Sequence, residues 1–133
     1  MSRIVNFTEA ASIGIHAVVL IARAGTNLIN VNFISERTST SKHHVAKVVQ
    51  RLVKAGILDS SRGPSGGFTL KHKPEKISFL EVYEAIEGKI EIADCPNKNP
   101  VCPFDKCLMG NVISNMTREF RDYLKSQLLK DYL

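Results

Sequence analysis

The sequence has no tryptophan, only three cysteines and no long apolar run free of polar residues. An odd number of cysteines argues against the disulfide framework of a small secreted domain. The apolar stretch near the N-terminus is interrupted by Glu9 and His16, so it is too short to span a bilayer and does not match a signal peptide. These features predict a cytoplasmic protein of bacterial type with no membrane partner. An enzyme is not predicted, because there is no C-x-x-C pair and no cysteine close to a histidine.

Acidic residues are outnumbered, with 13 Asp or Glu against 18 Lys or Arg and a net charge of +5. Between residues 42 and 76 there are eight basic residues and two acidic ones, which gives this segment a net charge of +6. Such clustering is typical of proteins that displace counterions from a phosphate backbone, and a solvated charged face is the plainer alternative. The eight basic residues are Lys42, Lys47, Arg51, Lys54, Arg62, Lys71, Lys73 and Lys76.

Residues 41 to 70 have the pattern of a helix followed by two short strands. Apolar residues recur at helical spacing after Ser41, which stands at the N-cap position, and Gly56 stands where a left-handed C-cap is expected. Short strands are predicted at 57–58 and 68–70, around the glycine-rich turn 62–67. A short helix and a hydroxyl-rich turn precede this unit. The pattern predicts a winged helix-turn-helix, in which the helix after Ser41 reads DNA.

Two further helices are predicted around this unit. A mostly apolar helix of about fifteen residues ends before Gly25 and forms a buried support. His16 lies on it, either as a hydrogen-bonded core histidine or as a metal ligand. Ser78 opens a capping box for an amphipathic helix over residues 79–87.

The C-terminal residues 108–133 predict one long helix with an apolar stripe. Such a helix has no core of its own to cover. The simplest partner for its apolar stripe is the same helix of a second subunit related by two-fold symmetry, and the alternative is that the helix folds back over its own domain. The predicted fold is mainly α with a small β-wing. It comprises a winged helix-turn-helix domain (1–88), a cysteine loop (89–107) and a dimerisation helix (108–133). The predicted stripe contains Val112, Ile113, Met116, Phe120, Tyr123, Leu124 and Leu128.

All three cysteines, Cys95, Cys102 and Cys107, lie within thirteen residues, which we call the cysteine segment (residues 95–107). Its three prolines disfavour regular structure. Thiolates at this spacing bind soft metals, so an iron-sulfur cluster and a zinc ion are both possible. A metal-free thiol switch is the alternative. Three thiolates leave one ligand to come from elsewhere in the chain, from a partner subunit or from another molecule.

The turn Arg62-Gly63-Pro64-Ser65-Gly66-Gly67-Phe68 resembles the RGPxGG(Y/F) wing of the bacterial winged-helix regulators related to IscR, NsrR and CymR. The resemblance covers nearly the whole chain. It implies a homodimer on a palindromic operator in double-stranded DNA, with the helix after Ser41 in the major groove and Arg62 in a minor groove. One departure is Ala46, where IscR has a glutamate, so the operator need not resemble that of IscR. The predicted DNA-contacting residues are Ser41, Lys42, His43, His44, Lys47, Arg51, Arg62, Gly63 and Ser65.

The cluster-binding relatives place three cysteines in the same loop, most often with five residues between neighbours, where this chain has six and four. Gly110 occupies the position of the IscR histidine ligand, so that ligand is excluded here. NsrR and a redox-sensing relative recruit an acid or a histidine from the first helix of the other subunit, and Glu9 and His16, with Ser12 between them, are the candidates here. The resemblance implies an iron-sulfur cluster, of the 2Fe-2S or 4Fe-4S type, on Cys95, Cys102 and Cys107 with His16 or Glu9 as the fourth ligand.

The sequence therefore predicts a homodimeric transcription regulator whose DNA affinity is controlled by this cluster. The signal would be redox state, nitric oxide or iron-sulfur status. The alternative prediction is a metal-free, thiol-switch or zinc-bound winged-helix repressor controlled by a partner protein.

Overall fold

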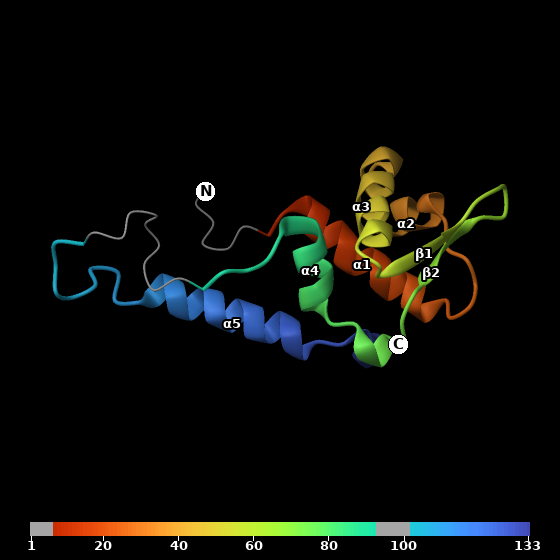
Figure 1. The fold of residues 1–133 in the computed structure, drawn as a ribbon. Coiled ribbons are helices and arrows are strands. Elements are labelled where there is room, and N and C mark those ends of the chain that lie inside the picture. The colour runs from red at the N-terminus through yellow and green to blue at the C-terminus, as the bar shows by residue number, and fades with distance from the viewer. Residues whose placement is uncertain (1–6, 93–101) are drawn as a thin grey trace.

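The computed structural model describes residues 7–92 and 102–133, and its fold is mainly α with a small antiparallel β-wing (Figure 1). The predicted fold class is confirmed. A long helix projects from the helical body at one end, and the wing extends from the other end. In chain order the elements are α1 (Glu9–Arg23), α2 (Val31–Thr38), α3 (Lys42–Lys54), β1 (Leu58–Ser61), β2 (Gly67–Leu70), the 3-10 turn η1 (Pro74–Lys76), α4 (Phe79–Glu87), α5 (Val112–Ser126) and the 3-10 turn η2 (Leu129–Tyr132).

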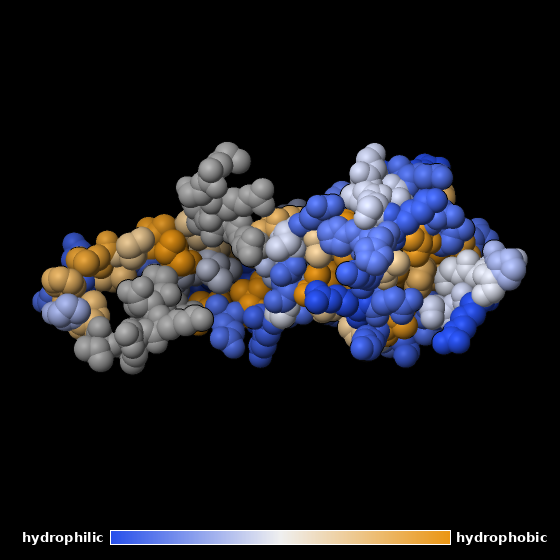
Figure 2. Space-filling model, turned by 90° about the horizontal axis from the view of Figure 1, so that it is seen from above, coloured by the Kyte–Doolittle hydropathy of each residue, from blue (hydrophilic) through white to orange (hydrophobic). Residues whose placement is uncertain are grey.

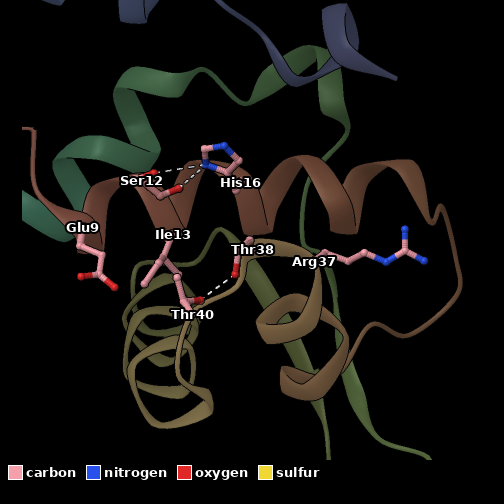
Figure 3. Close-up of a pocket in the computed structure, with 7 residues that line it drawn as sticks. All are labelled: Glu9, Ser12, Ile13, His16, Arg37, Thr38 and Thr40. Atoms are coloured by element: carbon pink, nitrogen blue, oxygen red, sulfur yellow. Dashed lines mark hydrogen bonds between the residues drawn. The ribbon is translucent and has the colours of Figure 1, made fainter.

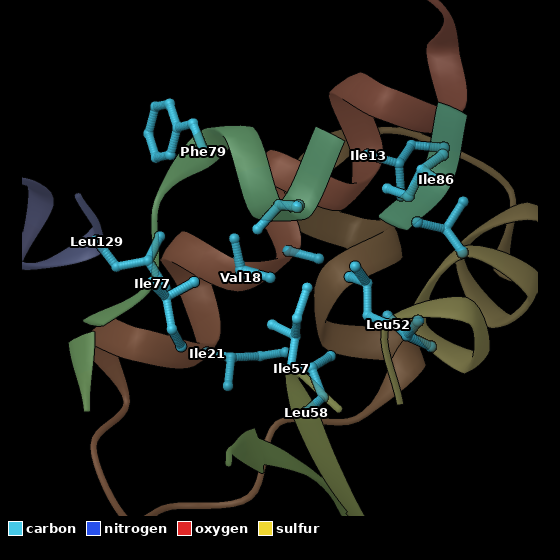
Figure 4. Packing of buried hydrophobic residues seen from close by; sticks show 14 of the residues in the cluster. Ile13, Val18, Ile21, Leu52, Ile57, Leu58, Ile77, Phe79, Ile86 and Leu129 are labelled. Atoms are coloured by element: carbon cyan, nitrogen blue, oxygen red, sulfur yellow. The ribbon is translucent and has the colours of Figure 1, made fainter. Parts of the chain in front are cut away.

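Helix α1 is the centre of the core, as its apolar sequence predicts. It contacts α2, α3, α4, β2 and η2, and its residues Val18 and Ile21 are completely buried (Figure 4). Helix α4 lies very close to α1 at Gly14, because a Cβ atom on this glycine would stand 2.1 Å from Cδ1 of Ile86. The core therefore fixes α3 and α4 against one common support.

Side-chain caps define where the helices begin. The hydroxyl of Ser41 accepts a hydrogen bond from the backbone N–H of His44 at 3.1 Å, and Ser78 caps α4 in the same way through the N–H of Glu81 at 3.2 Å. The predicted end of α3 is also confirmed, because Gly56 has a φ of +80°. These caps fix the first turn of the predicted DNA-reading helix.

The wing is a two-stranded hairpin that is joined to the body through Ile29. Strand β1 pairs with β2 from Leu58 opposite Leu70 to Ser61 opposite Gly67. The prediction of a strand at 57–58 was wrong in extent, because the N–H of Ile57 bonds to the carbonyl of Leu52 and closes the end of α3 instead. Ile29 and Phe68 exchange two backbone hydrogen bonds, of 2.8 and 3.2 Å, which tie the base of the wing to the segment before α2.

The prediction of a single helix over residues 108–133 was wrong. Helix α5 begins at Val112 and ends at Ser126, and the extended residues Gln127 and Leu128 separate it from η2. The N–H of Leu129 donates to the carbonyl of Ile77 at 3.0 Å, and the Leu129 side chain is completely buried. Burying a leucine contributes about 1.5–3 kcal/mol, so the last apolar residues are more stable in the core of their own domain than on a continued helix.

The apolar stripe of α5 is divided between two environments. Leu124 is 3% exposed within its own domain, and the Phe120 ring packs edge-on against Tyr83 with centroids 5.4 Å apart. Val112 and Tyr123 are about half exposed, at 51% and 55%. Part of the stripe therefore folds back onto its own domain, as the alternative prediction has it, and the rest of the stripe lies on the surface. Within the described residues, no helix is long and apolar enough to cross a membrane.

Candidate nucleic-acid interface and cysteine segment

Helix α3 presents one apolar and one polar face, and the core determines which face is free. Its buried stripe consists of Val45, Val48, Val49 and Leu52, each at most 2% exposed. The opposite face is hydrophilic in the view onto α3 (Figure 2). We call α3 the recognition helix. Its exposed side chains are Lys42, His43, Lys47, Gln50, Arg51 and Lys54, with the half-buried Ala46 between them.

Most cations of the recognition helix have no carboxylate close to them. In the described part of the chain a carboxylate lies within 4.0 Å of a basic side chain only where a carboxylate oxygen of Glu9 faces Nδ1 of His44 at 3.4 Å, and this contact is an ion pair when His44 is protonated. His44 therefore turns toward α1, away from the exposed positions of His43 and Lys47. A face of uncompensated positive charge is what binding to a phosphate backbone requires.

Arg51 has a structural partner that its sequence position did not reveal. Its Nη1 donates a hydrogen bond to the carbonyl oxygen of Ile86, in the last turn of α4, at 2.9 Å. This carbonyl lies at a helix C-terminus, where a cation is favoured by the helix dipole. The predicted contact of Arg51 with DNA stays a prediction, and the structure gives the side chain a second role between α3 and α4.

The wing carries its predicted contact residues at an exposed tip. Arg62, Gly63 and Ser65 are all exposed. Gly63 has a φ of +103°, a conformation that other residues rarely adopt, and its carbonyl accepts a hydrogen bond from the N–H of Gly66 at 2.9 Å. The turn thus holds Arg62 at the end of a short rigid hairpin, on a different element from the cations of the recognition helix.

The two candidate ligands of α1 line one hollow, together with residues of α2 and the turn after it (Figure 3). Figure 3 shows Glu9 and His16 pointing to different sides of α1. The interpretation of His16 as a core histidine was wrong, because its side chain is exposed. Its Nδ1 lies 2.7 Å from the carbonyl oxygen of Ser12. A carbonyl only accepts, so Nδ1 is the donor, and in the neutral ring Nε2 then has a free lone pair.

That arrangement is the one found in histidines that bind metals, where the second ring nitrogen donates to a carbonyl and fixes the ring. Glu9 is already paired with His44, so His16 is the better-prepared of the two candidates. No group of three or more His, Cys, Asp or Glu residues converges within the described ranges 7–92 and 102–133. Cys95 lies outside the described residues.

The two described cysteines differ in their surroundings. Cys102 is exposed, and Cys107 is half-buried in the turn that leads into α5. Backbone N–H groups of Asn111, Met109 and Gly110 donate toward the Cys107 sulfur and lower its pKa, with Asn111 the largest contributor. This favours the thiolate, the form that binds a metal or reacts as a nucleophile. The chemistry of these donors therefore fits a soft metal or a cluster.

The apolar groove beside α1 was not predicted from the sequence. Val19 and Leu20 of α1 line it together with Tyr123 of α5 and Tyr132 of η2. We call this surface the α1 groove. The sequence predicts that α1 is buried on most sides. Which side of α1 stays open depends on the path of the C-terminal residues, and this path does not follow from the sequence of α1. A second exposed apolar set, at the start of α5, contains Phe104, Leu108, Met109 and Val112 (Figure 2).

Comparison with known proteins places these features among transcriptional regulators. The sequence pattern of the Rrf2 family, described as "Iron-dependent Transcriptional regulator", matches residues 7–133. The HTH-type transcriptional regulator NsrR of Bacillus subtilis is 31% identical over 116 residues, which cover 86% of this chain and 80% of NsrR. The solved structure of CymR, the global cysteine regulator of B. subtilis, is similar with a TM-score of 0.79 at 20% identity and covers 96% of this chain and 95% of CymR. T. potens IscR is similar with a TM-score of 0.75 at 23% identity and covers 96% of this chain and 85% of IscR. At these identities the two structures show a shared fold.

Proposed function

Because this chain belongs to the Rrf2 family of transcriptional regulators, we propose that it binds operator DNA as a homodimer and that an iron-sulfur cluster on the cysteine segment controls its affinity. The observation that carries the DNA-binding part is the free cationic face of the recognition helix. That face lies opposite a buried stripe, so the core presents it to solvent in one fixed orientation.

In this proposal the recognition helix enters the major groove with its N-terminal half. Lys42 and Lys47 neutralise phosphates, and His43 and Gln50 face base edges. Arg62 at the wing tip reaches the neighbouring minor groove, whose negative potential attracts arginine. The remaining predicted contacts are Ser41, His44, Arg51, Gly63 and Ser65.

The proposed dimer rests on apolar surface that the single chain leaves exposed. Tyr123 is 55% exposed and borders the α1 groove, and Val112 lies about three turns away along α5. Residues eleven apart on a helix lie nearly on one face. A second copy of α5 would cover this face and place two recognition helices on a palindromic operator.

The proposed cluster ligands are Cys95, Cys102 and Cys107, with His16 of the partner subunit's α1 ahead of Glu9 as the fourth. Two observations support this donor set: the lowered pKa of Cys107, and the bond from Nδ1 of His16 to the Ser12 carbonyl, which leaves Nε2 of the neutral ring as a ligand atom. When bound, the cluster supplies a centre that responds to redox state, nitric oxide or iron-sulfur supply. Residues 88–92 connect the cysteine segment to α4, so the state of the segment can act on α4 and through Arg51 on the recognition helix.

One observation also favours the second candidate, a regulator that uses its thiols without a cluster. The lowered pKa of Cys107 favours its thiolate, which is the nucleophilic form of a cysteine, and this does not depend on a metal. Such a protein would respond by forming a disulfide or by binding a partner protein, and a bound zinc ion would be a further variant of it.

Anaerobic purification followed by iron and sulfide analysis separates the two candidates. The cluster proposal predicts a brown protein with iron and sulfide in equal amounts and a colourless, folded Cys102→Ala variant. The operator affinities of the two proteins should differ by roughly 5 to 150-fold, the usual range of allosteric coupling. His16→Ala should weaken the visible absorption, and Glu9→Gln should leave it unchanged. A colourless parent protein without iron would exclude the cluster and leave the thiol-based candidate.

A further inference from the structure

The exposed face of the recognition helix contains a shallow hollow that the proposed function does not yet use. Its wall residues are His43, Lys47, Gln50 and Arg51, and Ala46 lies among them. Carbon atoms make up most of its surface, although the longer side chains around it end in charged or amide groups or in an imidazole ring. We call it the Ala46 hollow.

The shape of the hollow follows from helix geometry. Residues three and four apart on a helix are surface neighbours, so Ala46 is bordered by His43 before it and Gln50 after it. Its single methyl group is much shorter than these side chains and forms the floor. The hydrogen bond from Arg51 to Ile86 holds the arginine by its tip, so that its apolar stem stays at the edge of the hollow.

The chemistry of the floor limits which base can lie against it. In the major groove guanine, adenine and cytosine present hydrogen-bonding groups and no methyl group, and a buried polar group without a partner is costly. Thymine alone presents a methyl group there, and alanine is one of the residues that contact it. The longer side chains around Ala46 end in donors and acceptors that serve the neighbouring bases and phosphates.

We propose that the Ala46 hollow takes the 5-methyl group of a thymine, so that each operator half-site has a thymine at the position facing Ala46. This inference rests on the proposed DNA-binding function. The expected gain is that of burying one methyl group, about fourfold in affinity for each half-site, or about fifteenfold for a symmetric operator.

The test begins with selection of duplexes from a random pool by the full-length dimer. Each thymine of the selected operator is then replaced, symmetrically in both half-sites, by deoxyuridine, which lacks only the methyl group. One symmetric pair should lower the affinity of the parent protein about fifteenfold. For Ala46→Gly the same replacement should cost much less, because the floor is gone. Ala55→Gly, the same change at the exposed end of α3, should keep the full penalty.

Ala46→Ser serves as a second variant if glycine destabilises the helix. Its hydroxyl makes the floor polar, so the methyl penalty should shrink there too. Two outcomes would overturn the inference without affecting the proposed binding of DNA. In the first, removing the methyl group lowers the affinity equally for the parent protein, Ala46→Gly and Ala46→Ser. In the second, no replacement of a thymine by deoxyuridine lowers the affinity of the parent protein. If the selection enriches no sequence over random DNA, the proposed function fails instead.

Discussion

Arg51 of the recognition helix donates a hydrogen bond to the carbonyl of Ile86 at 2.9 Å, and this contact joins α3 to the end of α4. The same end of α4 also holds the chain that leads to the cysteine segment. The carboxylate of Glu84 accepts a hydrogen bond from the N–H of Ile90 at 2.8 Å, and the hydroxyl of Thr8 donates to Glu87. The last turn of α4 is therefore connected to the recognition helix, to the start of α1 and to residues 88–92.

The first prediction separates the two roles of Arg51. Arg51→Ala should lower the free energy of unfolding by about 1 kcal/mol, because the bond to Ile86 is lost. It should also reduce the slope of log affinity against log salt by about one unit, if its remaining N–H groups contact a phosphate as predicted. Chemical denaturation and binding at several salt concentrations measure the two effects.

Lys47→Ala is the matched control, since Lys47 is exposed on the same face and, within the described residues, forms no side-chain hydrogen bond or ion pair. It should reduce the salt slope by about one unit and leave stability unchanged. A loss of stability in Arg51→Ala with an unchanged salt slope would limit Arg51 to its structural role.

The second prediction concerns the attachment of the wing. A Cβ atom at Gly67 would stand 2.7 Å from the carbonyl oxygen of Ile29, so Gly67→Ala should push β2 away from this segment. We expect a loss of stability of about 1–3 kcal/mol, as for other overpacked sites, together with weaker DNA binding. Ser65→Ala, at the exposed tip of the same hairpin, should leave the thermal unfolding temperature unchanged. Equal unfolding temperatures for both variants would contradict the close contact at Ile29.

The third prediction concerns the dimer. Val112→Asp combined with Tyr123→Asp places charges on the exposed apolar face of α5, so sedimentation should report a monomer that keeps its helical circular dichroism. Changing Phe120 and Leu124 instead would disrupt the domain itself, because Leu124 is only 3% exposed. Lys125→Glu changes the charge at an exposed position on the other side of α5 and should leave the dimer intact. A dimer that survives the double substitution would place the interface elsewhere.

Local signals predicted much of this fold. Ser41 and Ser78 are caps whose side-chain bonds form within three residues, and Gly56 ends α3 through its own backbone conformation, so each is visible in a short stretch of sequence. The C-terminal residues were predicted less well because the competition there is not local. Whether Leu129 continues a helix or enters the core depends on a partner, Ile77, that lies about fifty residues away in the chain.

In the candidate site, too, the features that depend on local sequence were predicted and those that depend on distant partners were not. The exposed cations of the recognition helix follow from its helical period, since a buried valine stripe determines the opposite face. The partners of Arg51 and His44 do not follow from it, because Ile86 and Glu9 come from other helices. Nor could the exposure of His16 be predicted, since it depends on which side of α1 the other elements cover.

The last prediction concerns the thiols in protein freed of metal. Because the pKa of Cys107 is lowered, its thiolate should form at lower pH than an ordinary cysteine thiolate, and alkylation should become fast at lower pH. The N–H groups that favour the thiolate come from the turn before α5, so the effect should disappear when the protein is unfolded in urea. Mass spectrometry after pulses of iodoacetamide over a pH series measures each cysteine separately. Cys102 in the same sample is the internal control for the pH dependence of the reagent itself. If the alkylation rates of the two cysteines depend on pH identically in the folded protein, the turn does not stabilise the Cys107 thiolate.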